Sequence, residues 1–376
     1  MNGPIRRVVL LLGVLFLVLV VDLTYWQAIA ADRLRQNQRN PRVELTRSGR
    51  ERGEILSADS VVLARSVPDP LDPGAYRREY LYGSVYAHVV GFSSALFGDR
   101  GVEAAHASLL RSRRDLTTSG ILNALLGDDL RPRSIQLTLY HELQATAARA
   151  LGDRRGAVVA LDPATGQVLA MVSSPSFNPN SLVGTNAAVV WDALTESTDG
   201  PLDNRAIAGS LPRLLTSEGT ITLDEMDPLS ALGIATRVAG AGQDGLIMRP
   251  HVTARVFDAD SNQVSRADPE PMADTFGYEA ALSLYGESRP LVVGGASQDR
   301  PPEAVGNSGV TETGAGEPAG WFFGVWPATR PTIVVAVVVY PDGPGAGGPG
   351  RAAAASVGRA VLGAWIGMIP TSASDE

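Results

Sequence analysis

The stretch GAVVALDPATGQVLAMVSSPSFNPN, Gly156 to Asn180, decides the fold that the sequence predicts. Residues 156–161 are small or apolar and predict a strand, and residues 167–173 predict a second strand that returns beside it. The five residues between them, DPATG, predict a tight turn, because the proline fixes φ and the glycine supplies a left-handed residue. The stretch therefore predicts an antiparallel β-hairpin.

The residues on both sides of this hairpin predict a larger sheet with helices. The predicted elements are a strand at 135–139, helices at 141–151 and 228–240, a loop and strand at 245–256, strands at 321–325 and 332–340, a Gly/Pro-rich linker at 341–350 and an amphipathic helix at 351–368. The run TIVVAVVVY at 332–340 has no polar alternation, which is typical of a strand buried on both faces. Strands at both ends with helices between and after them predict an α+β fold, an antiparallel sheet packed by helices.

Residues 32–132 have a different character, being polar and arginine-rich with short apolar runs. They predict two short strands at 52–56 and 61–64 and a helix at 102–110 that opens with Glu103. The composition becomes loop-like around Gly127-Asp128-Asp129, and we place a domain boundary there. We therefore expect a segment at 1–31, a β-rich domain at 32–132, a second domain at 133–368 and a tail at 369–376.

The N-terminal segment predicts export or insertion into a membrane. Arg6 and Arg7 precede fourteen apolar residues, 8–21. A cleaved signal peptide fits this pattern, because an A-x-A sequence follows at 28–30. We favour an uncleaved anchor over residues 5–26, which is long enough to span a bilayer and ends in an aromatic pair. Both interpretations place the bulk of the chain outside the cytoplasmic membrane.

The composition excludes several kinds of chemistry. A net charge of −8 argues against a nucleic-acid partner. The chain has no cysteine and no lysine, so thiolate nucleophiles, disulfides and lysine bases are excluded. No pair among the four histidines has a ligand spacing such as H-x-x-x-H, so we predict no metal site and no cofactor.

Short motifs spread along most of the chain resemble those of one protein family. They are LTYW at 23–26, NQRNPR at 37–42, RGEIL at 52–56, VLA at 62–64, AHVVG at 87–91, GVE at 101–103, the hairpin at 156–180, PLDNRA at 201–206 and RPH at 249–251. In this order they resemble the class B penicillin-binding proteins, of the actinobacterial penicillin-binding protein A type. The resemblance implies a membrane anchor, a β-rich pedestal (dimerisation-like) domain at 32–132 and a transpeptidase-like domain at 133–368.

The resemblance also implies an activity, because family members are D,D-transpeptidases that cross-link peptidoglycan stem peptides. Three motifs carry that chemistry: S-x-x-K, S-x-N and K-T-G. The lysine of the first motif activates the serine nucleophile, since a serine hydroxyl needs a neighbouring base. The K-T-G strand supplies a cation for the substrate carboxylate, and its backbone helps to hold the carbonyl oxygen.

The first two motifs are degenerate in this sequence. Aligned without gaps on Pro212, the nucleophile position falls on Leu215 and the lysine position on Glu218. Ser210 and Ser217 lie nearby, but neither is followed three positions later by a residue that can replace the lysine. The S-x-N match at 176–178 belongs to the structural end of the hairpin stretch, and the segment that should carry the true motif is missing between residues 222 and 228. The transpeptidase-like domain is therefore expected to be truncated.

The K-T-G position reads Glu312-Thr313-Gly314, so the expected cation is replaced by an anion. Two like charges roughly 4 Å apart repel by about 1 kcal/mol in water, and by more in a partly dry cleft. The substitution therefore opposes the binding of a substrate carboxylate. Glu218 and Glu312 could form a carboxylate pair across the cleft, but we interpret both as solvated acids.

We predict no catalytic residue and interpret Leu215, Glu218, Glu312, Thr313 and Gly314 as degenerate family positions. The chain is then a membrane-anchored pseudo-transpeptidase that acts through contacts with peptidoglycan or with cell-wall synthesis and division proteins. One alternative is an active D,D-transpeptidase with an unusual serine nucleophile. A second alternative is a degenerating paralogue without a role.

Overall fold

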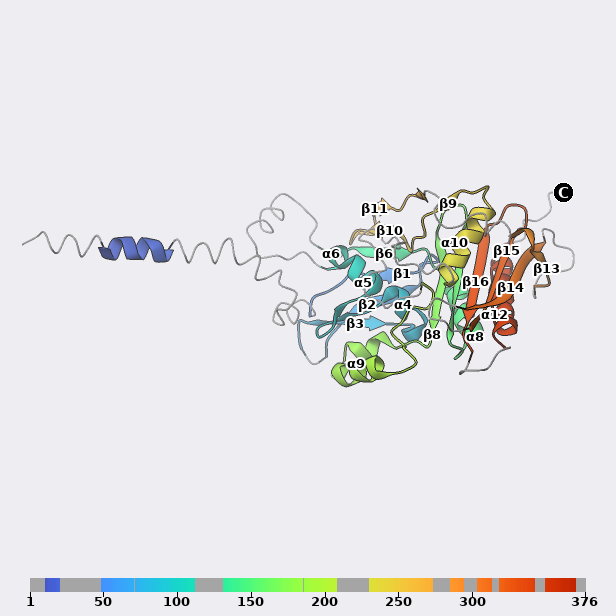
Figure 1. Cartoon of the computed structure of the whole chain (residues 1–376). Helices are drawn as coiled ribbons and strands as arrows, with labels where there is room; N and C mark the ends of the chain where they lie inside the picture. The colour runs from blue at the N-terminus through green and yellow to red at the C-terminus, as the bar shows by residue number, and fades with distance from the viewer. Residues whose placement is uncertain are drawn as a thin grey trace, which may run out of the picture. The chain divides into compact units, whose positions relative to one another are not determined.

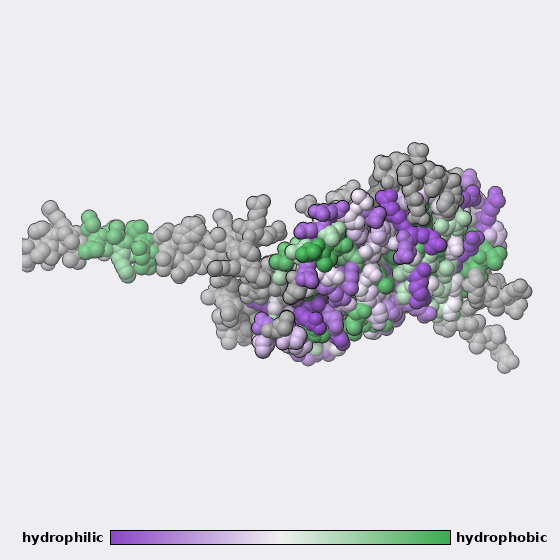
Figure 2. All heavy atoms as spheres, turned by 90° about the horizontal axis from the view of Figure 1, so that it is seen from below, coloured by the Kyte–Doolittle hydropathy of each residue, from purple (hydrophilic) through white to green (hydrophobic). Residues whose placement is uncertain are grey.

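The computed structural model describes residues 11–20, 49–70, 72–111, 131–184, 186–207, 230–272, 285–293, 303–312, 318–341 and 349–369. The chain divides into two units, residues 1–49 and residues 50–376. In the first unit, residues 11–20 form a helix with exposed leucine and valine side chains, coloured as hydrophobic in Figure 2. Within the described ranges, no helix combines the length and the apolar character needed to cross a membrane. The rest of the predicted anchor over 5–26 lies outside those ranges.

A six-stranded antiparallel sheet is the centre of the C-terminal half of the second unit (Figure 1). Its strand order is β13-β14-β15-β16-β7-β8. The bounds are Arg289–Leu291 for β13, Ala304–Glu312 for β14, Pro318–Trp326 for β15, Ile333–Val339 for β16, Gly156–Leu161 for β7 and Val168–Ser174 for β8. The predicted hairpin is confirmed as β7 and β8, with Gly166 at φ +77° in the turn.

Helices cover both faces of this sheet. They are α8 (His141–Leu151) and α12 (Pro349–Met368) on one face and α10 (Ala231–Ala241) on the other. Alternate residues of β7 separate the two faces, since Val158 packs with α8 and α12 while Val159 packs with α10. All residues of β7, β8 and β16 are buried, so the predicted α+β sheet packed by helices is confirmed.

A second six-stranded sheet combines early and late segments of the chain. Its order is β11-β10-β6-β1-β2-β3. The bounds are Gln263–Arg266 for β11, Thr253–Phe257 for β10, Ser134–Leu137 for β6, Ile55–Leu56 for β1, Val62–Pro68 for β2 and Tyr76–Tyr80 for β3. β1 and β6 are parallel, and the other neighbouring pairs are antiparallel. The predicted domain boundary near 127–129 lies outside the described residues, and the domain limits stay a prediction.

Short elements lie outside the two six-stranded sheets. They are η2 (Gly83–Val85), α4 (Ala87–Val90), α5 (Gly101–Ala105), α6 (Ala107–Leu110), η3 (Pro179–Leu182), α9 (Ala187–Glu196), and the paired strands β4 (Ser93–Ser94) with β5 (Gly98–Asp99) and β9 (Ile247–Met248) with β12 (Pro271–Met272). The prediction of one helix over 102–110 is wrong, because the chain breaks at His106 into α5 and α6. His106 has φ −108° and ψ 22°, and its Nε2 lies 2.9 Å from the Thr253 hydroxyl oxygen, so a tertiary contact accompanies the break.

The AHVVG and GVE segments cross each other at two glycines. Gly91 has φ +74°, and a Cβ added to it would lie 2.0 Å from the carbonyl oxygen of Arg100. Gly101 has φ +62°, and its added Cβ would lie 2.6 Å from the carbonyl oxygen of Val89. Only glycine therefore allows the two backbones to approach so closely.

Gly91→Ala is expected to lower the free energy of unfolding by roughly 2–4 kcal/mol, because backbone strain and overpacking add at this site. Gly98→Ala is the matched control, since Gly98 has φ +71° but nothing within 4 Å of an added Cβ. The control should cost about 1 kcal/mol of strain alone. Chemical denaturation of both variants measures the difference, and equal losses would contradict the close approach.

Candidate functional site

The predicted cleft positions are only partly within the described structure. Leu215 and Glu218 belong to residues 208–229, which lie outside it, as do Thr313 and Gly314. Glu312 is the last residue of β14, and its backbone pairs with Pro318 on β15. Glu312 thus lies at the end of a sheet strand, and the other four predicted positions lie outside the described residues.

The strand that leads to Glu312 lies near the edge of its sheet. β13 pairs with β14 only from Ala304 to Gly306, so within the described ranges no strand pairs with the outer edge of residues 307–312. On the inner edge β14 pairs with β15 along its whole length. Glu312 therefore ends a strand that β15 pairs along its whole length and that β13 pairs at its other end.

The PLDNRA segment, which precedes the predicted nucleophile position, is held by hydrogen bonds. The backbone N–H of Arg205 donates to the Ser173 hydroxyl at 3.0 Å, and the Asn204 side chain accepts from the backbone N–H of Ala206 at 3.1 Å. The carbonyl of Ala206 accepts from the N–H of Leu232 at the start of α10. Buried Asn204 and Arg205 thus fix the chain between β8 and α10 up to residue 207.

The S-x-N-like match at 176–178 has structural contacts. The Ser176 hydroxyl donates to the carbonyl of Ser84 at 2.8 Å and lies 3.4 Å from Nδ1 of His88. Phe177 is buried, and the Asn178 side chain accepts from the N–H of Asn180 at the start of η3. Nε2 of His88 lies 3.1 Å from the carbonyl of Pro201, so the imidazole donates there. Because the Ser176 proton is given to a backbone carbonyl, this serine and histidine do not form a nucleophile and base pair.

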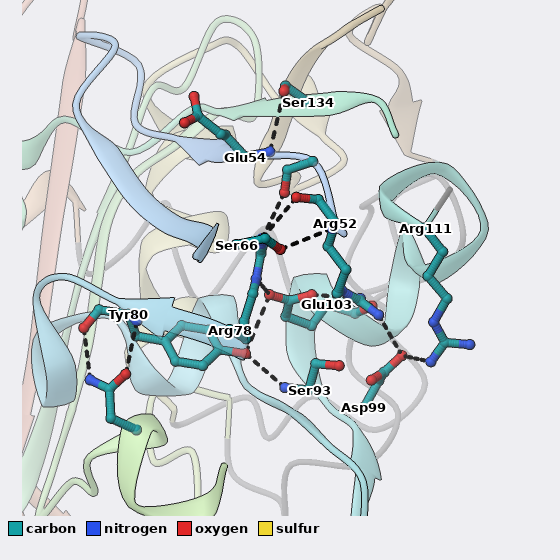
Figure 3. Close-up of polar contacts among 12 residues, drawn as sticks. Arg52, Glu54, Ser66, Arg78, Tyr80, Ser93, Asp99, Glu103, Arg111 and Ser134 are labelled. Carbon is teal, nitrogen blue, oxygen red and sulfur yellow. Dashed lines mark hydrogen bonds and ion pairs between the residues drawn. The ribbon is translucent and has the colours of Figure 1, made fainter. Parts of the chain in front are cut away.

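A buried charge cluster, which sequence reasoning missed, lies beside the second sheet (Figure 3). Glu103 on α5 is fully buried, and its two carboxylate oxygens accept from Arg52 Nη2 and Arg78 Nε, each at 2.6 Å. Arg52 also lies 3.5 Å from Asp99, and Asp99 pairs with Arg111. Arg52 and Glu103 belong to the RGEIL and GVE segments, but no local pattern in the sequence indicates that they pair.

The cluster stabilises the fold and does not suit proton transfer. Burial alone raises the pKa of Glu103, but Arg52 and Arg78 outweigh it, so the pKa of this carboxyl is lowered. Glu103 therefore stays ionised and cannot act as a general acid or base at neutral pH. Burial raises the pKa of Tyr80 well above its ordinary value, and the Glu103 charge raises it further. Arg78 also donates to the carbonyl of Gly53 at 2.8 Å, so the cluster ties β3 and α5 to the segment before β1.

Within the part of the chain that the structure describes, no group of three or more His, Asp or Glu residues is placed to hold a metal ion.

Two segments of the chain match models of known protein families. Residues 52–135 match the family model of the penicillin binding protein A dimerisation domain, and residues 156–212 match that of the penicillin binding protein transpeptidase domain. The peptidoglycan D,D-transpeptidase PbpA of Mycolicibacterium smegmatis is 37% identical over 223 residues, which cover 56% of this chain and 45% of that protein. PbpA of Mycobacterium tuberculosis H37Rv is 36% identical over 223 residues, with the same coverage. The chain thus spans less than half the length of these relatives.

The fold agrees with the sequence matches. The crystal structure of PBPA from Mycobacterium tuberculosis superposes with a TM-score of 0.66 and 21% identity, covering 84% of this chain and 99% of that one. Two segments of the chain thus match domains of penicillin-binding proteins, and the fold is that of the M. tuberculosis PBPA structure. The homologues are class B proteins of the PbpA and MrdA types, so the resemblance seen in the sequence is confirmed.

Proposed function

We propose that this chain is a penicillin-binding-protein homologue without acyl-transfer activity, a pseudo-transpeptidase that acts by contacts. The observation that carries the proposal is the complete absence of lysine from the sequence. The family chemistry uses one lysine to activate the serine and another at the K-T-G strand. Arginine stays protonated near neutral pH and cannot replace the lysine base.

The end of β14 gives independent support. Glu312 is the last residue of this strand, and we assign it to the position that the family motif gives to lysine. A carboxylate there repels the carboxylate of a stem peptide or a β-lactam. Both the nucleophile activation and the substrate recognition of the family are then lost together.

The proposed contacts are with peptidoglycan or with proteins of cell-wall synthesis and division. The relatives named above are peptidoglycan D,D-transpeptidases, and contact with peptidoglycan is the simplest function to retain when catalysis is lost. We also propose that residues 5–26 anchor the chain in the cytoplasmic membrane as a single span, with the bulk outside. The arginine pair at 6–7 and the exposed apolar helix at 11–20 support this arrangement.

The test is the intact mass of the purified protein after incubation with penicillin G. The M. tuberculosis PBPA, whose structure is described as a penicillin G acyl-enzyme complex, is the positive control. We expect the mass of this chain to stay unchanged while the control gains one adduct per molecule. Circular dichroism on the same sample must show a folded protein. An adduct would contradict the proposal, and peptide mapping would then show whether Ser210 or Ser217 carries it.

A further inference from the structure

One face of helix α9 is exposed and combines apolar with acidic side chains. It carries Val189, Asp192, Ala193 and Glu196, which recur at the three- and four-residue spacing of one side of a helix. Val189 is 72% exposed, and the other three residues are exposed as well. In Figure 1 α9 lies at the lower margin of the second unit, and Figure 2 views the molecule from that side. We call these four residues the α9 ridge.

The opposite face of α9 is packed against the rest of the fold. Val190, Trp191 and Leu194 are half-buried and contact the hydrophobic core. The Trp191 ring stacks on Phe97, which lies in the turn between β4 and β5, with the ring centroids 4.6 Å apart. Because these contacts do not use the ridge, the ridge stays accessible on a helix whose position is fixed by its other face.

The residues of the ridge do not favour the helix on which they lie. Valine is a poorer helix former than alanine, because it loses χ1 freedom against the preceding turn. Asp192 and Glu196 carry like charges at i and i+4, and Glu196 is at the C-terminal end, where the helix dipole disfavours negative charge. Neither carboxylate is paired with a residue in the described ranges, and α9 has no basic residue. Residues that weaken their own element in this way indicate a functional site.

The arrangement of the ridge selects one kind of partner. Val189 offers an apolar contact, and the small side chain of Ala193 lets a second helix approach closely. Asp192 and Glu196 are one turn apart, about 6 Å along the helix axis, so basic residues four positions apart on a facing helix would meet both. The same negative charges disfavour an anionic membrane surface. The ridge therefore fits a basic amphipathic helix.

We propose that the α9 ridge docks a positively charged amphipathic helix of another protein. An apolar side chain of that helix packs on Val189 and Ala193, and two of its basic side chains pair with Asp192 and Glu196. This inference rests on the proposed function, because it gives the proposed protein contacts a surface and a partner chemistry. The β-lactam experiment does not involve α9, so the two proposals can fail separately.

The experiment uses the full chain in the cells that make it. A photoreactive benzoylphenylalanine is placed at Ala188, which is exposed beside the ridge, and in a control at Arg149, an exposed position on α8. Mass spectrometry identifies the cross-linked segment of the captured protein. We expect a segment with helical periodicity and basic residues four positions apart, captured from Ala188 with roughly five times the yield from Arg149.

Three outcomes would overturn the proposal. The first is a yield at Ala188 no higher than at Arg149. The second is a cross-link from Ala188 to a second copy of this chain, to lipid or to peptidoglycan. The third is a captured segment that is acidic or lacks the basic residues at helical spacing. In each case the absence of acyl transfer would still be decided by the intact mass measured with penicillin G.

Substitutions in the ridge separate docking from a structural role. Asp192→Asn with Glu196→Gln should lower the yield at Ala188 by roughly fivefold, while the midpoint of thermal unfolding stays the same or rises because repulsion is removed. Val189→Ala should act in the same two directions. The matched control, Glu142→Gln with Glu303→Gln, removes two exposed carboxylates elsewhere in the described ranges and should leave the yield unchanged. An equal loss of yield in the control, or an unchanged yield in the ridge variants, would contradict docking at this surface.

Discussion

Replacing Glu103 with glutamine is expected to lower the free energy of unfolding by about 3–5 kcal/mol. The substitution keeps the size of the side chain but leaves Arg52 and Arg78 without the carboxylate that both contact at 2.6 Å. Both arginine side chains are buried, so water cannot replace the lost partner at low cost. Chemical denaturation followed by tryptophan fluorescence measures the loss.

Glu79→Gln is the matched control for this experiment. Glu79 pairs with Arg65 at 2.8 Å, but side-chain exposures of 34% and 47% leave this ion pair in contact with solvent. Exposed pairs contribute about 0–1 kcal/mol, so the control should be nearly neutral. If Glu103→Gln cost no more than Glu79→Gln, the buried cluster would not stabilise the fold as its geometry indicates.

The second large effect expected is a loss of stability between pH 7 and pH 5. Burial lowers the pKa of both His88 and His106 from the ordinary value of 6.5 to about 4. The unfolded chain therefore binds protons first as the pH falls, and stability present above pH 6.5 is lost toward pH 4. Each histidine should contribute a loss of about 2 kcal/mol between pH 7 and pH 5. The pKa of His251 is also lowered by burial, which acts in the same direction.

Measuring unfolding at pH 7, 6 and 5 separates this effect from the carboxylates. The pKa of Glu103 is lowered in the folded state. Its contribution to stability is therefore present above the ordinary carboxyl pKa of 4.5 and is lost below that pH, outside the range from pH 7 to pH 5. Double substitution His88→Gln and His106→Gln should reduce the slope between pH 7 and pH 5 and leave only the contribution of His251, even where the variant is less stable overall. An unchanged slope in the double variant would show that other groups cause the dependence.

The elements that were predicted correctly are those with strong local patterns. The helix at 141–151 agrees residue for residue with α8, and the hairpin agrees with β7 and β8 to within one residue. In both cases periodicity and turn residues determine the conformation within a few positions of the chain. The strand predicted at 332–340, which has no polar alternation, is buried on both faces over β16, Ile333–Val339.

The features that were missed depend on contacts between distant residues. Arg52 and Glu103 are 51 positions apart, and His106 meets Thr253 across 147 positions. No local pattern indicates which charges are paired inside the fold, so the cluster and the break at His106 could not be predicted from the sequence.

The cleft positions raise a different problem. Their degeneracy was inferred from a family pattern, and it stays a prediction for residues 208–229 and 313–317.

The strand order β11-β10-β6-β1-β2-β3 has a consequence for the way this chain is made. β1, β2 and β3 are synthesised early, but their neighbours β6 and β10 begin at Ser134 and Thr253. At typical rates of roughly 5–20 residues per second, the ribosome completes this sheet on the order of ten seconds after its first strands emerge. During that interval the edge of β1 has no partner and can pair with another chain. We expect the nascent chain to need a chaperone until β6 and β10 are in place.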